Sequence, residues 1–372
     1  MHSIEVILIM LLAVVVSSYL VRALPFSAPL PLVQITLGVL IAALSDSAAE
    51  LDSEIFLFVF LPPLLFLDGW RIPKTSLFHD KVTVISLSFG LVLFTVIGAG
   101  FLIHWLVPGM PLPVAFALAA VVSPTDPVAV SSIISRYPMP KRLMHILEGE
   151  SMLNDATGLV CFRFAVVAAS TGQFLLERAS LTFLWMVVGG LGLGVAVTLV
   201  ITHTQHWLSR HLGEESGTSI LINLLIPFGA YLAAEAVHAS GILAAVSAGI
   251  TMSYIELTGR APATTRVQRV AVWDMVRFAL NGLMFVLLGE QLPSIVSRAM
   301  TTAGEVDGYG VSAWLVISAL VITAALIVLR FAWIWVSLRL MLLYARRPWS
   351  RTANEIDEVD SRIVPVMSLA GV

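Results

Sequence analysis

Apolar runs separated by short polar segments follow one another along almost the whole chain. About 20 apolar residues are enough for a helix to cross a bilayer. The pattern therefore predicts eleven membrane-spanning helices, near residues 4–22, 28–46, 53–70, 82–107, 113–134, 144–170, 181–202, 218–237, 240–256, 271–293 and 312–338. The first is expected to be a retained span, because His2 and Glu5 stand where a signal peptide carries basic residues.

The composition points to the same class of protein. Of the 372 residues, 58% are hydrophobic and 12% are charged, and the mean hydropathy is +0.93. Soluble domains carry about 25% charged residues, so the chain is expected to be an all-α polytopic membrane protein. The single cysteine, Cys161, excludes an intrachain disulfide, and its apolar setting predicts a buried thiol.

The polar segments between the predicted spans alternate between basic and acidic. Basic loops stay on the cytoplasmic side of a membrane, so the N-terminus is expected outside and the C-terminus in the cytoplasm. Eleven spans fit this alternation throughout, whereas one missed span would break it. The basic set holds Arg22, Arg71, Lys74, Lys81, Arg136, Lys141, Arg142, Arg210, Arg260, Arg266, Arg269, Arg339, Arg346, Arg347, Arg351 and Arg362, and the other set holds Asp46, Glu50, Asp52, Glu54, Glu177, Glu305 and Asp307, with Arg178 and Arg298 as its bases.

Three acids, Asp126, Glu150 and Asp155, stand inside apolar stretches. An Asp at the centre of a membrane helix costs roughly 2.5–3.5 kcal/mol on insertion scales, and such residues mark ion or proton pathways. Pro124 and Pro127 flank Thr125-Asp126, and each opposes a continuous helix. The stretch is therefore expected to be a broken helix whose free carbonyls face a cavity, as in transporter cation sites.

Glu150, Ser151, Asn154 and Asp155 have the spacing of one helix face, so all four side chains are predicted to point into one cavity. Together with Thr125 and Asp126 they supply oxygen ligands that suit a hard monovalent cation. The alternative is a hydrogen-bonded network that only holds helices together. Three carboxylates cost far more than hydroxyl contacts would, which favours the ion site.

The charged residues inside the predicted spans are expected to have two different roles, a structural ion pair and a carrier of protons and cations. Glu150 and Arg330 are predicted to form a buried ion pair, whose loss would leave an uncompensated charge. Arg163 lies about 12 Å along the helix from Asp155 and is interpreted as structural. Asp155 has no comparable fixed partner, and desolvation beside other acids favours the protonated form of a carboxylate. It can then hold either a proton or a cation, which is the minimal requirement for exchange.

Other polar residues carry weaker signals. Asp68, at the cytoplasmic end of the span that contains Pro62 and Pro63, either lines an inward funnel or caps the helix end, and the two readings stay open. Asn281 is expected to be an interhelical contact. The histidines are expected in a solvated cytoplasmic loop rather than in a metal or pH-sensing site; they are His203, His206 and His211.

These motifs resemble the monovalent cation:proton antiporter-1 family, the NhaP/NHE-like sodium/proton exchangers, in its bacterial form. The resemblance rests on Thr125-Asp126-Pro127 and on the segment from Gly149 to Asp155. It extends over the whole chain through Leu61-Pro62-Pro63, Ser240 to Leu243, Asn281 with Phe285 and Gly289, and Arg330.

The resemblance implies the NhaA/NhaP-like inverted-repeat fold with crossed broken helices at the site. Residues 1–372 would form one transmembrane antiporter domain, with ion-site helices at about 53–170 and 271–338 and the remaining spans as a dimerisation scaffold. In the family the chain continues beyond a motif like Ser368 to Val372, so the last two spans are expected to be missing.

The resemblance also implies roles for the site residues. Asp155 would carry proton and cation in turn, and the Asn154-Asp155 pair goes with electroneutral exchange. The residues that help hold the ion would be Thr125, Asp126 and Ser151. Glu150 and Arg330 match the family's buried ion pair.

The expected function is secondary antiport of Na⁺, or of Li⁺ or K⁺, against H⁺ in the cell (inner) membrane, for sodium transport and pH homeostasis. The expected partners are these ions, the lipid bilayer and a second copy of the chain, with no cofactor, no nucleic acid and no enzymatic activity. An intramembrane aspartyl hydrolase using Asp126 and Asp155 is the alternative, but the chain shows no second Asp in a Gly-flanked pattern. A passive channel would use rings of charge, whereas the acids form a single asymmetric cluster.

Overall fold

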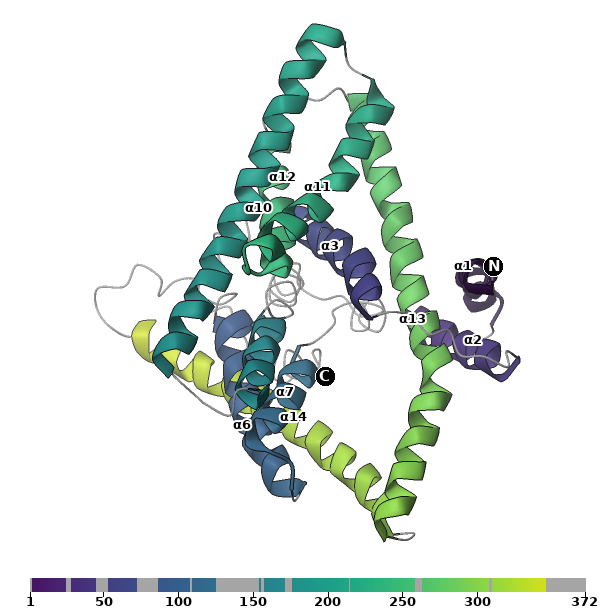
Figure 1. Cartoon of the computed structure of the whole chain (residues 1–372), viewed down its shortest axis with the longest axis vertical. Coiled ribbons are helices and arrows are strands. Elements are labelled where there is room, and N and C mark those ends of the chain that lie inside the picture. The colour runs from purple at the N-terminus through teal and green to yellow at the C-terminus, as the bar shows by residue number, and fades with distance from the viewer. Residues whose placement is uncertain are drawn as a thin grey trace. The chain divides into compact units, whose positions relative to one another are not determined.

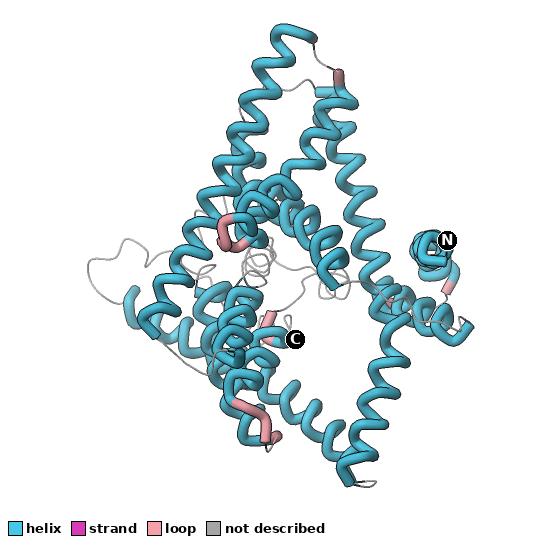
Figure 2. The backbone as a smooth tube through the Cα atoms, viewed as in Figure 1, coloured by secondary structure: helices cyan, strands magenta, loops and turns pink. Residues whose placement is uncertain are grey.

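The structure is a computed structural model. It describes residues 2–24, 28–44, 53–71, 86–107, 109–124, 154, 157–170, 176–213, 215–257, 263–307 and 310–345. Within these residues the backbone is helical apart from short turns (Figure 2). Apolar helices satisfy all their backbone hydrogen bonds internally, which lipid requires. The predicted all-α polytopic fold is confirmed for this part of the chain.

Each predicted span coincides with a helix where the structure describes it (Figure 1). The elements are α1 (His2–Ala23), α2 (Leu30–Leu44), α3 (Ser53–Arg71), the π-helical turn η1 (Ser86–Leu91) leading into α6 (Val92–Leu106), α7 (Leu112–Val122), the helix Thr157–Ser170, α10 (Leu176–Leu212), α11 (Ser216–Ala236), α12 (Gly241–Leu257), α13 (Ala263–Asp307) and α14 (Gly310–Ala345).

By length and composition, six of the described helices are able to cross a membrane, and four shorter apolar helices accompany them. The six stretches are Glu5–Ala23, Ser88–Leu106, Leu184–Leu212, Ser216–Ala236, Thr264–Thr301 and Val316–Ser337. The chain is thus a multi-pass membrane protein, and the count of eleven spans stays a prediction.

The predicted loop around His203, His206 and His211 is wrong, because all three residues lie in α10. The apolar run that predicts this span ends near residue 202, but the polar residues that follow, such as Gln205, also favour helix. The helix ends instead at Gly213, whose φ of 88° is the left-handed conformation that closes many helices, and whose N–H bonds the Ser209 carbonyl at 3.1 Å.

Two compact units make up the chain: unit 1 comprises Met1–Arg71 and Leu184–Ser312, and unit 2 comprises Ile72–Phe183 and Ala313–Val372. This division puts α3 and α13 into unit 1. The predicted assignment of about 53–170 and 271–338 to the ion site concerns function, and it stays a prediction.

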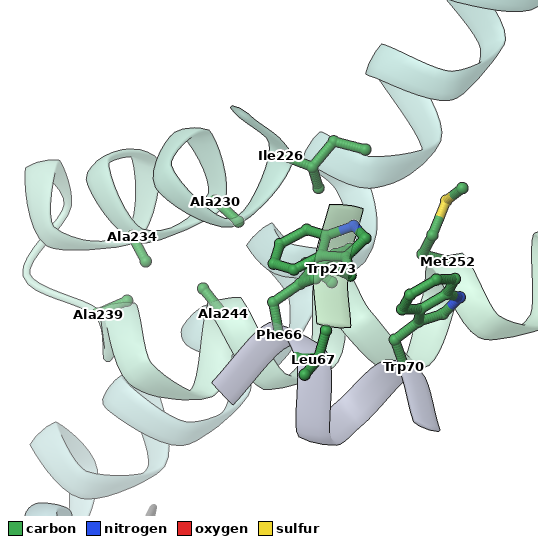
Figure 3. Packing of buried hydrophobic residues seen from close by; sticks show 11 residues of the cluster. Phe66, Leu67, Trp70, Ile226, Ala230, Ala234, Ala239, Ala244, Met252 and Trp273 are labelled. Atoms are coloured by element: carbon green, nitrogen blue, oxygen red, sulfur yellow. The ribbon is translucent and has the colours of Figure 1, made fainter. Parts of the chain in front are cut away.

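Unit 1 has a core in which α3, α11, α12 and α13 meet (Figure 3). The rings of Phe66 and Trp273 stack with their centroids 5.2 Å apart, and small alanines of α11 and α12 let the helices approach. The backbones of α3 and α12 are in direct contact, since a Cβ on Gly69 would collide with the Val246 carbonyl and one on Gly249 with that of Phe66. Close approach through small residues is typical of helices in lipid.

A second cluster in unit 1 joins α1, α2 and α13. Its buried residues come mainly from α1 and α13 and include Met10, Val14 and Val286. A Cβ on Gly38 would collide with the Val286 carbonyl, so α2 and α13 also touch through their backbones.

The core of unit 2 is built by α6, α7 and α14. Buried Val96, Ala99 and Ile103 of α6 pack against alanines of α7, and Leu329 of α14 covers them. Cys161 packs against this cluster and is half-buried, which is less than its sequence setting predicts.

Candidate functional site

Most of the predicted ion site lies outside the described residues. This applies to Thr125, Asp126, Glu150, Ser151 and Asp155. Four predicted residues are described: Asn154 and Arg330 in unit 2, and Asp68 and Asn281 in unit 1. The residues that border this predicted site on either side of 125–153 are described.

The two borders of the predicted site meet inside unit 2. α7 ends at Val122, followed by Ser123 and Pro124. A Cβ on Gly158 would collide with the ring of Pro124 and would lie 3.0 Å from the Ala120 carbonyl oxygen. The helix Thr157–Ser170 therefore begins in direct contact with the end of α7, so the structure brings together the residues on either side of 125–153.

The meeting point is polar although its surroundings are apolar. Asn154 is 1% exposed and Thr157 is 4% exposed. The Oγ atom of Ser123 is buried and has no hydrogen-bond partner among the described residues. Polar groups are expensive to bury unless they gain partners, so this end of α7 is a place where a polar ligand or side chain is favoured.

Arg330 lies on α14 and is only 4% exposed. Its neighbours hold α14 against α6: Leu329 meets Gly98, and the ring of Trp333 covers Gly90. The ring centroids of Trp333 and Phe94 are 5.3 Å apart. An arginine this deeply buried faces the protein and not the lipid. Its predicted partner, Glu150, is outside the described residues, so the ion pair stays a prediction.

The π-helical turn η1 was not predicted. It opens the α6 segment, and its Ser88 has no exposed surface. Single π-helical turns are rare and are frequent at functional sites, because they leave the regular hydrogen-bond ladder incomplete. No residue type in Ser86–Leu91 signals a π-turn, so the sequence offered no way to find it.

Asp68 and Asn281 belong to unit 1. Asp68 is half-buried, close to the end of α3 at Arg71, and both the funnel and the capping interpretations remain open. Asn281 is half-buried beside Gly282, where a Cβ would lie 3.1 Å from Nε2 of Gln34 on α2. This position suits the predicted interhelical role.

Sequence reasoning missed a polar cluster that joins four helices of unit 1. Glu256 of α12 accepts hydrogen bonds from Nε1 of Trp70 at 2.8 Å and from Nη1 of Arg269 at 2.6 Å. Trp273 donates Nε1–H to the Asn223 side chain at 2.8 Å. We call these five residues the polar clamp. It ties α3, α11, α12 and α13 together, and Arg71 contacts Asp274 next to it.

The signals for such residues were present but weak. The sequence predicts a loop at Arg269, whereas this residue lies within α13. Glu256 stands at the end of a predicted span, where an acidic residue is common and does not indicate a buried contact. Glu290, inside the predicted span 271–293, is 2% exposed and was also missed. An acid within a span is itself a functional signal, so Glu290 was within reach of the sequence.

No group of three or more His, Cys, Asp or Glu side chains gathers as a metal site among the described residues. The predicted monovalent-cation ligands Asp155, Asp126, Ser151 and Thr125 lie outside them.

Comparisons with known proteins point in one direction. The family described as "Sodium/hydrogen exchanger, transmembrane" matches residues 7–363. The uncharacterized Na⁺/H⁺ exchanger YjcE of Escherichia coli is 42% identical over 369 residues, which cover 98% of this chain and 66% of that protein. A sodium, potassium, lithium and rubidium/H⁺ antiporter of Bacillus pumilus is 40% identical, covering 98% of this chain and 53% of that protein. The chain thus spans about half to two thirds of the length of these relatives.

A solved structure shares the fold. The sodium proton antiporter MjNhaP1 from Methanocaldococcus jannaschii superposes with a TM-score of 0.72, covering 100% of this chain and 85% of that one, at 18% sequence identity.

Proposed function

The chain belongs to the sodium/hydrogen exchanger family, and from this premise we propose that it exchanges Na⁺, or another monovalent cation such as Li⁺ or K⁺, for H⁺ across the cell membrane. Relatives at 40–42% identity are named as antiporters of sodium, potassium, lithium and rubidium against protons, which supports a broad monovalent cargo. The cargo ions are substrates, and the proposal includes no resident cofactor.

One observation carries the proposal: the borders of the predicted ion site meet at the contact between Gly158 and Pro124. Ser123, next to Pro124, adds a buried hydroxyl. Asn154, which precedes Asp155 in the sequence, is also buried. Arg330 supplies a buried cation in the same unit. This setting suits a desolvated carboxylate that binds a proton and a cation in turn.

In the proposed cycle Asp155 is the carrier. It binds a cation from one side together with oxygen atoms of Thr125, Asp126 and Ser151, and it releases the cation when it takes a proton on the other side. One positive charge moves in each direction, so no net charge crosses. The Glu150–Arg330 pair holds the neighbouring helices in place and does not titrate in the cycle.

The orientation and assembly belong to the same proposal. The alternating basic segments support an outside N-terminus and a cytoplasmic C-terminus. The family supports a homodimer. The proposed ion-site helices are those at about 53–170 and 271–338, and the remaining spans would form the dimerisation scaffold. The borders of the site and Arg330 lie in unit 2.

Transport in proteoliposomes tests the function. The protein is reconstituted with a pH-sensitive dye inside, and an inward Na⁺ gradient is applied. We expect proton efflux that starts only when Na⁺, Li⁺ or K⁺ is added. Cation uptake that needs no proton movement would show a channel and would overturn the proposal. Cleavage of a transmembrane peptide that requires Asp126 and Asp155 would favour the hydrolase.

A further inference from the structure

Two helices carry exposed tryptophans that are one bilayer apart. On α10 these are Trp185 and Trp207, and on α14 they are Trp314 and Trp335, with 45–57% of each residue exposed. At 1.5 Å per residue the members of each pair are about 33 and 32 Å apart along the helix. The hydrocarbon core of a bilayer is about 30 Å thick, and tryptophans collect at its two edges. Each helix therefore places one tryptophan at each edge.

The second exposed tryptophan of each helix has a basic residue one turn later. Nδ1 of His211 lies 2.8 Å from the Trp207 carbonyl oxygen, which only accepts hydrogen bonds, and the two rings are 4.7 Å apart. The guanidinium of Arg339 lies 5.1 Å from the centre of the Trp335 ring. We call these the α10 pair and the α14 pair. Trp185, at the other end of the α10 span, instead donates Nε1–H to the Val237 carbonyl at 3.1 Å.

We propose that the α10 pair and the α14 pair bind the phosphate groups of anionic phospholipids, one pair on each unit. A guanidinium that lies on an indole face is held in position and keeps its N–H groups free for phosphate oxygens. Basic residues at a membrane surface attract anionic lipid. The tryptophan beside each one sits at the depth of the headgroups.

The surroundings of the α10 pair suit a lipid. Arg210, next to His211 in the sequence, is exposed and supplies a cation, while Leu208 and Leu212 are exposed apolar side chains that acyl chains would cover. Glu215, an exposed acid in the following turn, is engaged by the Thr218 hydroxyl at 3.0 Å. An apolar surface beside an exposed arginine matches a molecule with an apolar tail and an anionic head, and free phosphate has no such tail.

The alternation of spans gives the two pairs a common side. α10 and α14 correspond to the seventh and eleventh predicted spans, so their carboxyl-terminal ends are predicted to face the same side, the cytoplasm.

Lipid titration tests the proposal. The full protein in neutral detergent is titrated with phosphatidylglycerol or phosphatidylcholine, and the apparent affinity is read from the rise in melting temperature. We expect phosphatidylglycerol to stabilise the protein more than phosphatidylcholine does. Arg339→Gln and Trp335→Leu are each expected to weaken the affinity for phosphatidylglycerol, about fivefold for the arginine, and to leave phosphatidylcholine unaffected. His211→Gln combined with Arg210→Gln tests the α10 pair in the same way.

Matched controls separate this site from general surface charge. Arg298→Gln removes an exposed arginine of the predicted opposite side, and Trp314→Leu removes a tryptophan at the other edge. Both are expected to keep the wild-type preference. Equal stabilisation by both lipids, an equal shift with inorganic phosphate, or an equal loss in Arg298→Gln would each overturn the proposal. Because the readout is lipid binding, it is independent of the exchange assay.

Discussion

Asn154 and Arg330 are polar side chains that unit 2 buries almost completely. Burial of an arginine in a membrane protein is tolerated only against a partner or a wet cavity. The sequence already predicted Asn154 for the ion site and Arg330 for a structural ion pair, since a charge or an amide in an apolar run stands out without any structure. It could not predict Ser88 or Glu256 as well, because their significance comes from a π-turn and from contacts with Trp70 and Arg269 far along the chain.

The carrier role of Asp155 predicts the effect of removing its charge. Asp155→Asn keeps the size of the side chain and removes the proton and cation site, so exchange should fall to the level of empty liposomes while the protein remains folded. Ion-driven proton flux in proteoliposomes measures this. Asp274→Asn, which changes an exposed acid in unit 1, serves as the control and should retain exchange. Normal exchange by Asp155→Asn would exclude the proposed role.

The predicted ion pair can be tested by a double-mutant cycle. Glu150→Ala and Arg330→Ala should each destabilise the protein by about 3–5 kcal/mol, because each leaves the other charge buried and unpaired. The double variant should lose clearly less than the sum of the two. Thermal unfolding in detergent gives the three values. Strict additivity would mean that the two side chains do not interact.

At the scale of elements, helices were easier to predict than their ends. Apolar runs located a helix for every predicted span because length and hydrophobicity decide membrane insertion. The ends depend on local chemistry instead. α10 continues beyond residue 202 to Leu212 because the first helix-closing glycine is Gly213. α13 also extends beyond both ends of its predicted span, 271–293, and runs from Ala263 to Asp307.

The contact between α7 and the helix Thr157–Ser170 depends on one glycine. In Gly158→Ala the new methyl group would overlap Pro124, so the helices must separate and the protein should lose about 1–3 kcal/mol of stability. Because this contact borders the proposed ion site, the exchange rate should fall too. Gly192→Ala is the matched control: nothing lies within 4 Å of its Cβ, so stability should stay equal or rise by up to about 1 kcal/mol. Thermal unfolding and proton flux measure both effects, and unchanged exchange in Gly158→Ala would contradict the placement of the site.

At the scale of the whole molecule, the chain consists of two compact units, and each is interrupted in sequence by the other. The NhaP-like fold itself was predictable, since motifs far apart in the chain resemble one family and the solved antiporter structure confirms the fold. The division into units was not, because apolar runs look alike whichever unit they join. α3 packs with α12 through glycines, and no periodicity in either helix identifies that partner.

The one-for-one exchange proposed for Asp155 predicts independence from voltage. A net charge moved across the membrane would couple to the potential at about 2.3 kcal/mol per 100 mV. K⁺ is itself a proposed cargo, so the potential is clamped with a gradient of a permeant anion and equal K⁺ on both sides. In such liposomes the Na⁺ distribution at equilibrium should follow the pH gradient alone. A distribution that shifts with the clamped potential would show that a second group changes its protonation in each cycle.

The contact of α3 with α12 has a mechanical consequence. Packed helices can shift relative to one another when the side chains between them change rotamers. Gly69 and Gly249 place no side chain there, so the carbonyls of Val246 and Phe66 lie against bare backbone. Sliding would bring main-chain atoms into collision, so we expect the two helices to move together as one rigid element. Their amide hydrogens should then exchange last in unit 1.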